Sequence, residues 1–143
     1  MLNKLLIIDD DLVTIKICEL LVTNTQFAKE VTKFVNGKEA IDYFSNYFER
    51  KKKKETVEIP PDLILLDLYM PVMDGWEFLD NFIRKYSGRI GDTKIAILSS
   101  SINPQDFMKA QEYPEVIDFI NKPLLAFTLE DLKQNNDLKK FFN

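Results

Sequence analysis

The sequence predicts a single open, doubly wound α/β domain built on a five-stranded parallel sheet. Three observations favour it. Short apolar or β-branched runs recur along the chain, segments with helical periodicity separate them, and the runs are apolar on both faces. Strands with two apolar faces are typical of parallel sheets covered by helices on both sides. A chain of 143 residues suits one domain with a substantial core.

The predicted strands are the five short runs themselves. They comprise residues 4–9 (KLLIID), 31–35 (VTKFV), 62–67 (DLILLD), 94–99 (KIAILS) and 116–120 (VIDFI). Helices are expected between and after them, over residues 12–24, 37–49, 75–87, 104–112 and 128–141. The sequence shows no internal repeat, and five strands that alternate with helices in this length define one α/β unit.

Apolar spacing supports the first and third helices. In the first, one stripe comprises Val13, Ile17, Leu20 and Leu21, which we expect to face the sheet. In the third, the corresponding stripe comprises Phe78, Leu79, Phe82 and Ile83. Both stripes follow the i, i+3, i+4 spacing of an amphipathic helix.

Capping residues mark three helix starts. Asn36 precedes Glu39 by three residues, and Thr128 precedes Asp131 in the same way. Asn103 is followed by proline at the first helical position, a common arrangement at helix N-termini. These signals place the starts of the second, fifth and fourth helices.

The segment ERKKKKETVEIPP, residues 49–61, is the one irregular region. Its basic run and two prolines favour a solvated loop, although a docking surface for an acidic partner is the alternative. The tail stops with the last predicted helix, so we expect residues 1–143 to form a single domain without an output domain.

Composition excludes several function classes. The net charge of −4 disfavours nucleic acid or an anionic membrane as partner, and no apolar run approaches the roughly 18 residues of a membrane span. The N-terminus lacks the features of a signal peptide. With one cysteine, Cys18, expected to be buried and inert, the cytoplasm is the expected location.

The absence of histidine removes the commonest general base and the commonest metal ligand. The chain therefore cannot itself be a phosphohistidine donor. Its chemistry must rest on carboxylates, hydroxyls and lysine.

Polar side chains follow four of the predicted strands. They are Asp9, Asp10 and Asp11 after the first strand, Asp67 after the third, Ser99, Ser100 and Ser101 after the fourth, and Lys122 after the fifth. Each alone suits an ordinary cap, turn or loop residue, and for Asp11 we expect a helix cap. Ligands of open α/β sheets bind beyond the carboxyl ends of the strands, where these groups would meet. Carboxylates crowded there would repel one another unless a hard cation such as Mg²⁺ intervened.

These motifs resemble the receiver domain of bacterial two-component response regulators, the CheY-like domains. LLIIDD, LILLDLYMPVMDG, IAILSS and FINKP occur in the family's order and cover nearly the whole chain. The resemblance implies a flavodoxin-like fold with strand order 2-1-3-4-5.

For the metal and the acceptor, the resemblance implies specific residues. Asp67 corresponds to the phosphoacceptor, and Asp9 and Asp10 to the acidic pair that binds Mg²⁺, with Mn²⁺ as a substitute. Tyr69 corresponds to a position that lends only its backbone carbonyl to the metal.

For catalysis and switching, Lys122 corresponds to the family's lysine and precedes Pro123, whose peptide bond is usually cis in the family. Ser99 corresponds to the switch hydroxyl. Phe119 occupies the aromatic switch position, where tyrosine is more usual. Tyr69 and Ser101 flank the phosphoryl site at positions thought to control water access, and we expect the bulky Tyr69 to slow loss of the phosphoryl group.

The function implied is that of a stand-alone response regulator, a signalling switch and not an enzyme with an external substrate. Its phosphoryl donor would be a sensor histidine kinase or a histidine phosphotransfer protein. Its effector would bind the face formed by the fourth helix, fifth strand and fifth helix. Dimerisation through the fourth and fifth helices stays open.

Three alternatives differ in what they require. A haloacid dehalogenase-type hydrolase needs a second aspartate two residues after the nucleophile, where this chain has Tyr69. A flavodoxin-like flavin carrier needs a Ser/Thr/Gly phosphate loop after the first strand, where DDDLVT would repel the phosphate. A degenerate receiver, a binding module that is never phosphorylated, is the serious alternative.

Overall fold

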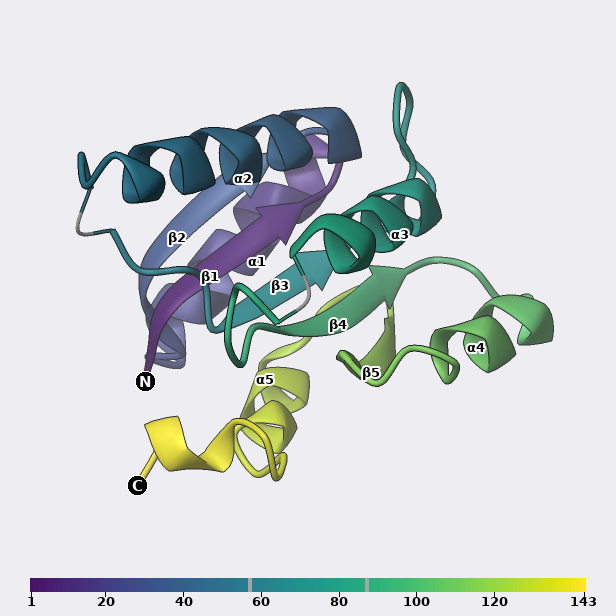
Figure 1. Ribbon diagram of the computed structural model, residues 1–143. Coiled ribbons are helices and arrows are strands. Elements are labelled where there is room, and N and C mark those ends of the chain that lie inside the picture. Colours follow the sequence, from purple (N-terminus) through teal and green to yellow (C-terminus); the bar gives the residue numbers. More distant parts are fainter. Residues whose placement is uncertain (57, 87) are drawn as a thin grey trace.

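The computed structural model, which describes residues 1–56, 58–86 and 88–143, confirms the predicted sheet. Within these ranges five parallel strands form one sheet in the order β2-β1-β3-β4-β5 (Figure 1). The strands are β1 (Leu2–Ile8), β2 (Ala28–Phe34), β3 (Leu63–Leu66), β4 (Lys94–Ser99) and β5 (Val116–Asn121). Sequence periodicity and strand order therefore agree on a flavodoxin-like topology.

Helices alternate with the strands and cover both faces of the sheet. They are α1 (Leu12–Asn24), α2 (Gly37–Lys52), α3 (Gly75–Tyr86), α4 (Pro104–Ala110) and α5 (Ala126–Leu132), followed by a short 3₁₀ turn, η1 (Lys139–Phe141). One core lies between the sheet and helices α2 and α3, and another between the sheet and helices α1 and α5. No helix in the described ranges is long and apolar enough to cross a membrane.

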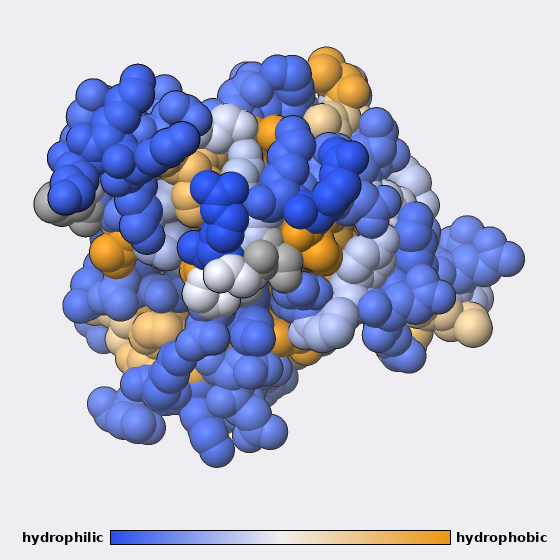
Figure 2. All heavy atoms as spheres, in the orientation of Figure 1, coloured by the Kyte–Doolittle hydropathy of each residue, from blue (hydrophilic) through white to orange (hydrophobic). Residues whose placement is uncertain are grey.

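Alternating residues of the central strands fill the two cores. Ile64 and Leu66 of β3 pack on the side of α2 and α3, whereas Leu63 and Leu65 pack on the side of α1 and α5. All four side chains are buried, as continuous apolar runs predict for a parallel sheet. The visible surface in Figure 2 is mostly hydrophilic, with apolar residues in small separate areas.

The predicted core-facing stripe of α1 is wrong for Val13, Ile17 and Leu20, which are exposed, whereas Leu21 is partly buried and packs against the core. Val13 and Leu20 are 66% and 54% exposed, and the buried residues are Ile15, Cys18 and Val22. Most residues of this helix are apolar, so spacing alone allows more than one inward face. Asp11 caps the helix by accepting a 3.0 Å hydrogen bond from the Val13 N–H, and the short turn after β1 sets the helix's rotation. Cys18 is buried, as expected.

The last predicted helix, residues 128–141, is also wrong in its extent. α5 begins at Ala126 without a side-chain cap and ends at Leu132, so Thr128 lies inside the helix and does not cap it. The chain then turns, which buries Leu138 completely and stacks Phe142 on Phe27. These contacts with the α1 side of the sheet require a bend that one continuous helix would not make.

The other boundaries differ by a few residues. Asn36 and Asn103 cap α2 and α4 as predicted. The first two lysines of the basic run belong to the last turn of α2, and residues 51–54 are exposed. Val57, inside the predicted loop, and Ser87, the last residue of the predicted third helix, lie outside the described ranges.

Candidate functional site

The candidate site lies at the carboxyl edge of the sheet, where the central strands end. Asp9 follows β1, Asp67 follows β3, Ser99 ends β4 and Lys122 follows β5. Parallel strands end at a common edge, so residues more than one hundred positions apart in sequence meet there. The structure confirms that these segments converge.

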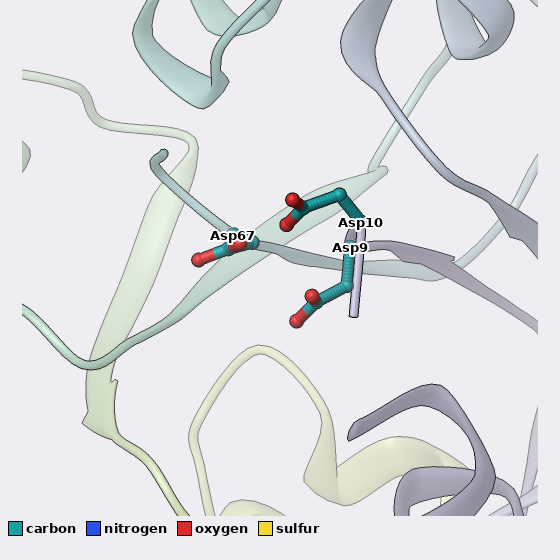
Figure 3. A group of neighbouring side chains, drawn as sticks. All are labelled: Asp9, Asp10 and Asp67. Atoms are coloured by element: carbon teal, nitrogen blue, oxygen red, sulfur yellow. The ribbon is translucent and has the colours of Figure 1, made fainter. Parts of the chain in front are cut away.

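Three carboxylates form the centre of the site. Asp9, Asp10 and Asp67 each contribute one oxygen, and these oxygens lie within 4.8 Å of one another. Figure 3 shows the three side chains beside the ends of β1 and β3. Asp9 and Asp67 are buried, whereas Asp10 is exposed to solvent. The cluster is therefore open on the side of Asp10.

Lys122 contributes the one positive charge that contacts this cluster within the described residues. Its Nζ lies 2.9 Å from Asp9 Oδ2 and 3.5 Å from Asp67 Oδ1. The peptide bond between Lys122 and Pro123 is cis, as the resemblance implied. The lysine thus bridges the carboxylates that follow β1 and β3.

The pKa values of this cluster reflect burial first and the neighbouring charges second. Burial, together with the charge of Asp9, raises the pKa of Asp67 to about 6, although Lys122 opposes the shift. Burial likewise raises the pKa of Asp9 against the effect of Lys122. Burial alone would lower the pKa of Lys122, but the two carboxylates outweigh it and raise that pKa. One ammonium group does not neutralise the cluster.

A divalent cation fits this arrangement. Asp9 Oδ1 accepts a hydrogen bond of 2.9 Å from the Asp11 N–H, and Asp9 Oδ2 lies 2.9 Å from Lys122 Nζ, so the lysine compensates this buried oxygen. The three carboxylates still outnumber that one ammonium group, and like charges within 4.8 Å of one another are costly unless a further cation compensates them. Three carboxylates without nitrogen or sulfur ligands suit Mg²⁺, or Mn²⁺ in its place.

The raised pKa of Asp67 makes the stability of the metal-free protein depend on pH. The unfolded chain ionises this carboxyl at its ordinary pKa near 4, whereas the folded protein retains the proton until pH is about 6. Between these values the folded state binds more protons, so the free energy of unfolding falls as pH rises. A difference of about 2 pKa units corresponds to roughly 3 kcal/mol.

Urea unfolding in EDTA, at intervals from pH 4 to pH 7, measures this effect. Asp67→Asn serves as the reference because it lacks the titrating group and keeps every other carboxyl of the chain. We expect the variant to gain stability relative to wild type by about this amount across the range. A difference that stays constant with pH would contradict the prediction.

The loop after β3 approaches its own strand closely. A Cβ atom on Gly75 would lie 2.2 Å from the backbone oxygen of Asp67, and the Gly75 N–H donates a 2.7 Å hydrogen bond to the Leu68 oxygen. Only glycine fits this position without a shift of the backbone. Gly75 begins α3, in agreement with the helix predicted from residue 75, and it holds the start of that helix against Asp67.

Ser99 and Phe119, the hydroxyl and the aromatic residue predicted around the site, lie on different strands. Ser99 is buried, and its Oγ accepts a 3.1 Å hydrogen bond from the Ser101 N–H. Phe119 is half-buried between β5 and α4, with its ring centroid 5.8 Å from that of Phe107. Ser99 and Phe119, the predicted switch residues, therefore lie on the neighbouring strands β4 and β5, with Phe119 packed against α4.

Asp106 is a residue near the site that the sequence analysis missed. It lies in the first turn of α4 and is buried, and its carboxylate accepts hydrogen bonds from the side chains of Tyr69, Ser101 and Trp76. Asn103-Pro104 marks the start of α4, and the sequence places Asp106 in its first turn, where the helix dipole favours an acid. No local pattern signalled that Tyr69, distant in sequence, would bind it.

Known proteins resemble this chain over most of its length. The response regulator receiver domain family matches residues 5–135. Among curated proteins, the transcriptional regulatory protein YdfI of Bacillus subtilis is 36% identical over 100 residues, which cover 69% of this chain and 38% of YdfI. Overall, the chain spans about a third of the length of the curated relatives it matches.

Solved structures share the fold. A two-component response regulator from Cytophaga hutchinsonii is 27% identical with a TM-score of 0.78, covering 96% of this chain and 98% of that one. The phosphorylated cyanobacterial phytochrome response regulator RcpA is 27% identical with a TM-score of 0.68, covering 91% of this chain and 87% of that one. Family match, strand order and acidic cluster agree, and this chain belongs to the response regulator receiver domain family.

Proposed function

We propose that this chain is a phosphorylation switch in which Asp67 accepts a phosphoryl group from a phosphohistidine on a partner protein. The observation that carries the proposal is the meeting of Asp9, Asp10 and Asp67 with Lys122 at one edge of the sheet. In the reaction, a carboxylate oxygen of Asp67 forms a bond to phosphorus. The bond between phosphorus and the donor's imidazole nitrogen breaks, and its electron pair stays with the imidazole.

Each residue of the cluster has a role that its surroundings support. Asp67 is buried beside Lys122, which holds the nucleophilic oxygen in place and neutralises charge on the transferring group. Asp9, Asp10, Asp67 and the backbone carbonyl of Tyr69 would hold Mg²⁺. When bound, that ion would supply positive charge that offsets the negative charge of the reacting groups. RcpA, a relative by fold and sequence, has been solved in a phosphorylated form.

Switching follows from the position of Ser99. Its Oγ now accepts a hydrogen bond from the Ser101 N–H, and phosphorylation of Asp67 would offer a charged acceptor to the same hydroxyl. A charge-assisted hydrogen bond is worth about 1.5–3 kcal/mol, which shifts a two-state equilibrium by roughly 10- to 150-fold. The unphosphorylated chain is then expected to populate the active arrangement to a minor extent.

The signal would reach an effector through the face of α4, β5 and α5. Movement of Ser99 leaves space that Phe119 fills, and Phe119 lines a groove between α4 and β5. Phe107, which also lines this groove, is an exposed apolar residue, as are Ile102 just before α4 and Met108 on α4. They give an effector, or a second copy in a weak dimer, an apolar contact whose shape depends on Phe119.

The exposed apolar stripe of α1 is the proposed contact for the phosphoryl donor. Ile17 lines a cavity of about 370 Å³ together with Lys122 and Pro123, next to the cluster. Leu20, one turn further along α1, is exposed. A partner helix that carries the phosphohistidine would cover this apolar face while its imidazole reaches Asp67.

A charge at Leu20 tests this contact. Leu20→Asp is expected to lower the rate of transfer from a phosphorylated histidine protein about tenfold or more, because it places a charge in an apolar interface. Phosphorylation by acetyl phosphate, which needs no docking, should keep its wild-type rate. Met108→Asp on α4 is the matched control, and equal losses in both variants would contradict a donor site on α1.

Incubation of the wild-type protein with Mg²⁺ and acetyl phosphate, followed by intact-mass measurement, tests the proposed function. We expect one phosphoryl adduct, lost when EDTA replaces Mg²⁺. The second donor is a phosphorylated histidine kinase or phosphotransfer protein. No adduct from either kind of donor would overturn the proposal and leave a binding module that is never phosphorylated.

A further inference from the structure

Asp106 joins three segments around the mouth of the site. Its Oδ2 accepts hydrogen bonds from the Tyr69 hydroxyl and, at 2.6 Å, from the Ser101 hydroxyl. Its Oδ1 accepts a 3.3 Å hydrogen bond from the Trp76 indole N–H. The donors belong to the loop after β3, the loop after β4 and helix α3, so one carboxylate links all three to α4.

Two of these hydrogen-bond donors, Tyr69 and Ser101, belong to the loops around the proposed phosphoacceptor Asp67. Tyr69 lies two residues after Asp67, and its ring extends far enough to bind a residue of α4. Ser101 donates its N–H to Ser99 Oγ, and its carbonyl accepts a 3.1 Å hydrogen bond from the Asn121 side chain, next to Lys122. Asp106 therefore binds the side-chain hydroxyls of Tyr69 and Ser101. The backbone of Tyr69 lies close to Asp67 in the sequence, and the backbone of Ser101 contacts Ser99 and the residue before Lys122.

Capping of α4 does not explain this arrangement. Asn103 already caps the helix by accepting a 3.0 Å hydrogen bond from the Gln105 N–H. A carboxylate that is only 7% exposed costs desolvation energy, and here side chains from other segments compensate that cost. Burial alone would raise the pKa of Asp106, but the hydrogen bonds from Ser101, Tyr69 and Trp76 outweigh it and keep that pKa below its ordinary value.

We propose that Asp106 is a positioning residue of the phosphoryl site, which holds the Tyr69 ring and the Ser101 loop in place and so limits the access of water to phosphorylated Asp67. The inference rests on the proposed function. In hydrolysis, a water oxygen bonds to phosphorus, the bond between phosphorus and the Asp67 oxygen breaks, and orthophosphate leaves. Tyr69 held by Asp106 restricts the space from which that water attacks, which gives the expected slow loss of the phosphoryl group a structural cause.

Asp106→Ala is expected to raise the rate constant of phosphoryl loss about tenfold. This factor corresponds to a decrease of about 1.4 kcal/mol in the activation free energy of hydrolysis. Tyr69→Phe keeps the ring and removes only the hydroxyl, so it should give much of the same increase. If Asp106 acts through that hydroxyl, the double variant will be no faster than the faster single variant. Asp106→Asn keeps an acceptor oxygen and should restore a rate within about threefold of wild type, because neutral acceptors bind about half as strongly.

Asp80→Ala is the matched control. Asp80 also accepts a hydrogen bond from a tyrosine, 2.6 Å from the Tyr113 hydroxyl, but this bond joins α3 to the segment after α4 and not to the residues beside Asp67. Its rate of phosphoryl loss should equal that of the wild type. An equal acceleration in Asp80→Ala would assign the effect to loosened packing and overturn the proposal.

Two readouts need no phosphorylation. Amide hydrogen exchange of residues 99–103 in the metal-free protein should rise about tenfold in Asp106→Ala. Trp76 is the chain's single tryptophan, so a shift in its fluorescence reports loss of the Asp106 contact directly. Exchange as in wild type would overturn the proposal, as would an unchanged rate of phosphoryl loss or additive effects with Tyr69→Phe.

These readouts separate the two proposals. If wild-type protein accepts no phosphoryl group, the proposed function fails, and the exchange data still decide whether Asp106 orders the mouth of the cluster. If Asp106→Ala does not fold, as judged by circular dichroism, Tyr69→Phe and Asp106→Asn carry the same comparison with smaller perturbations. Faster exchange together with an unchanged rate of phosphoryl loss would assign Asp106 a purely structural role.

Discussion

Asp67→Asn is expected to abolish phosphoryl incorporation while leaving the protein folded. The amide has no negatively charged oxygen to attack phosphorus, so neither acetyl phosphate nor a phosphohistidine can form the acyl phosphate. The buried side chain keeps its shape, and loss of its charge relieves the repulsion from Asp9 that raises its pKa. Loss of the adduct with retained stability would therefore report chemistry and not unfolding.

Intact-mass measurement after incubation with Mg²⁺ and acetyl phosphate gives the result. Asp42→Asn is the control, because Asp42 is an exposed carboxylate of α2 that pairs with Lys38 at 2.7 Å, away from the strand ends. It should carry the wild-type adduct. An adduct of equal amount on Asp67→Asn would show that another residue accepts the phosphoryl group, and peptide mapping would then identify it.

Lys122→Met is expected to slow phosphorylation by acetyl phosphate about 10²- to 10³-fold, the usual effect of removing one preorganised charge or donor from a transition state. Lys122 is the cation that contacts both Asp9 and Asp67 in the described residues, at 2.9 Å and 3.5 Å. Its ammonium is placed to neutralise charge that develops on the transferring phosphoryl oxygens. Methionine retains most of the apolar stem and removes the ammonium group.

Lys133→Met is the matched control for this experiment. Its side chain is 17% exposed, the same fraction as that of Lys122, and its Nζ lies 3.1 Å from Glu130 on α5. Initial rates of adduct formation, measured at saturating Mg²⁺, should be near wild type for Lys133→Met. A rate for Lys122→Met within about threefold of the wild-type rate would show that Lys122 does not contribute to phosphoryl transfer.

Much of the fold and the centre of the site follow from local features of the sequence. Apolar runs such as residues 63–66 show where strands are buried on both faces, and the polar residue after each run marks the strand's carboxyl end. Because parallel strands end at one edge, Asp9, Asp67 and Lys122 are predictable neighbours without knowledge of any side-chain geometry. The negative charge of the neighbouring carboxylates then indicates that a cation binds there.

The tertiary structure decided what local patterns leave open. α1 is apolar around most of its circumference, so its rotation depends on Asp11 and on the sheet beneath it, and Val13 points outward. The chain after Leu132 bends because Leu138 and Phe142 find apolar partners far away in sequence.

Asp106 shows the same limit at the site itself. Its helix start is visible in the sequence, but its three donors come from segments that only the folded sheet brings together. Periodicity and capping act over a few residues, and they therefore define elements and strand ends. The free energy of burying a particular side chain depends on neighbours from the whole chain, and it therefore decides helix rotation, the path of the tail and the hydrogen bonds of Asp106.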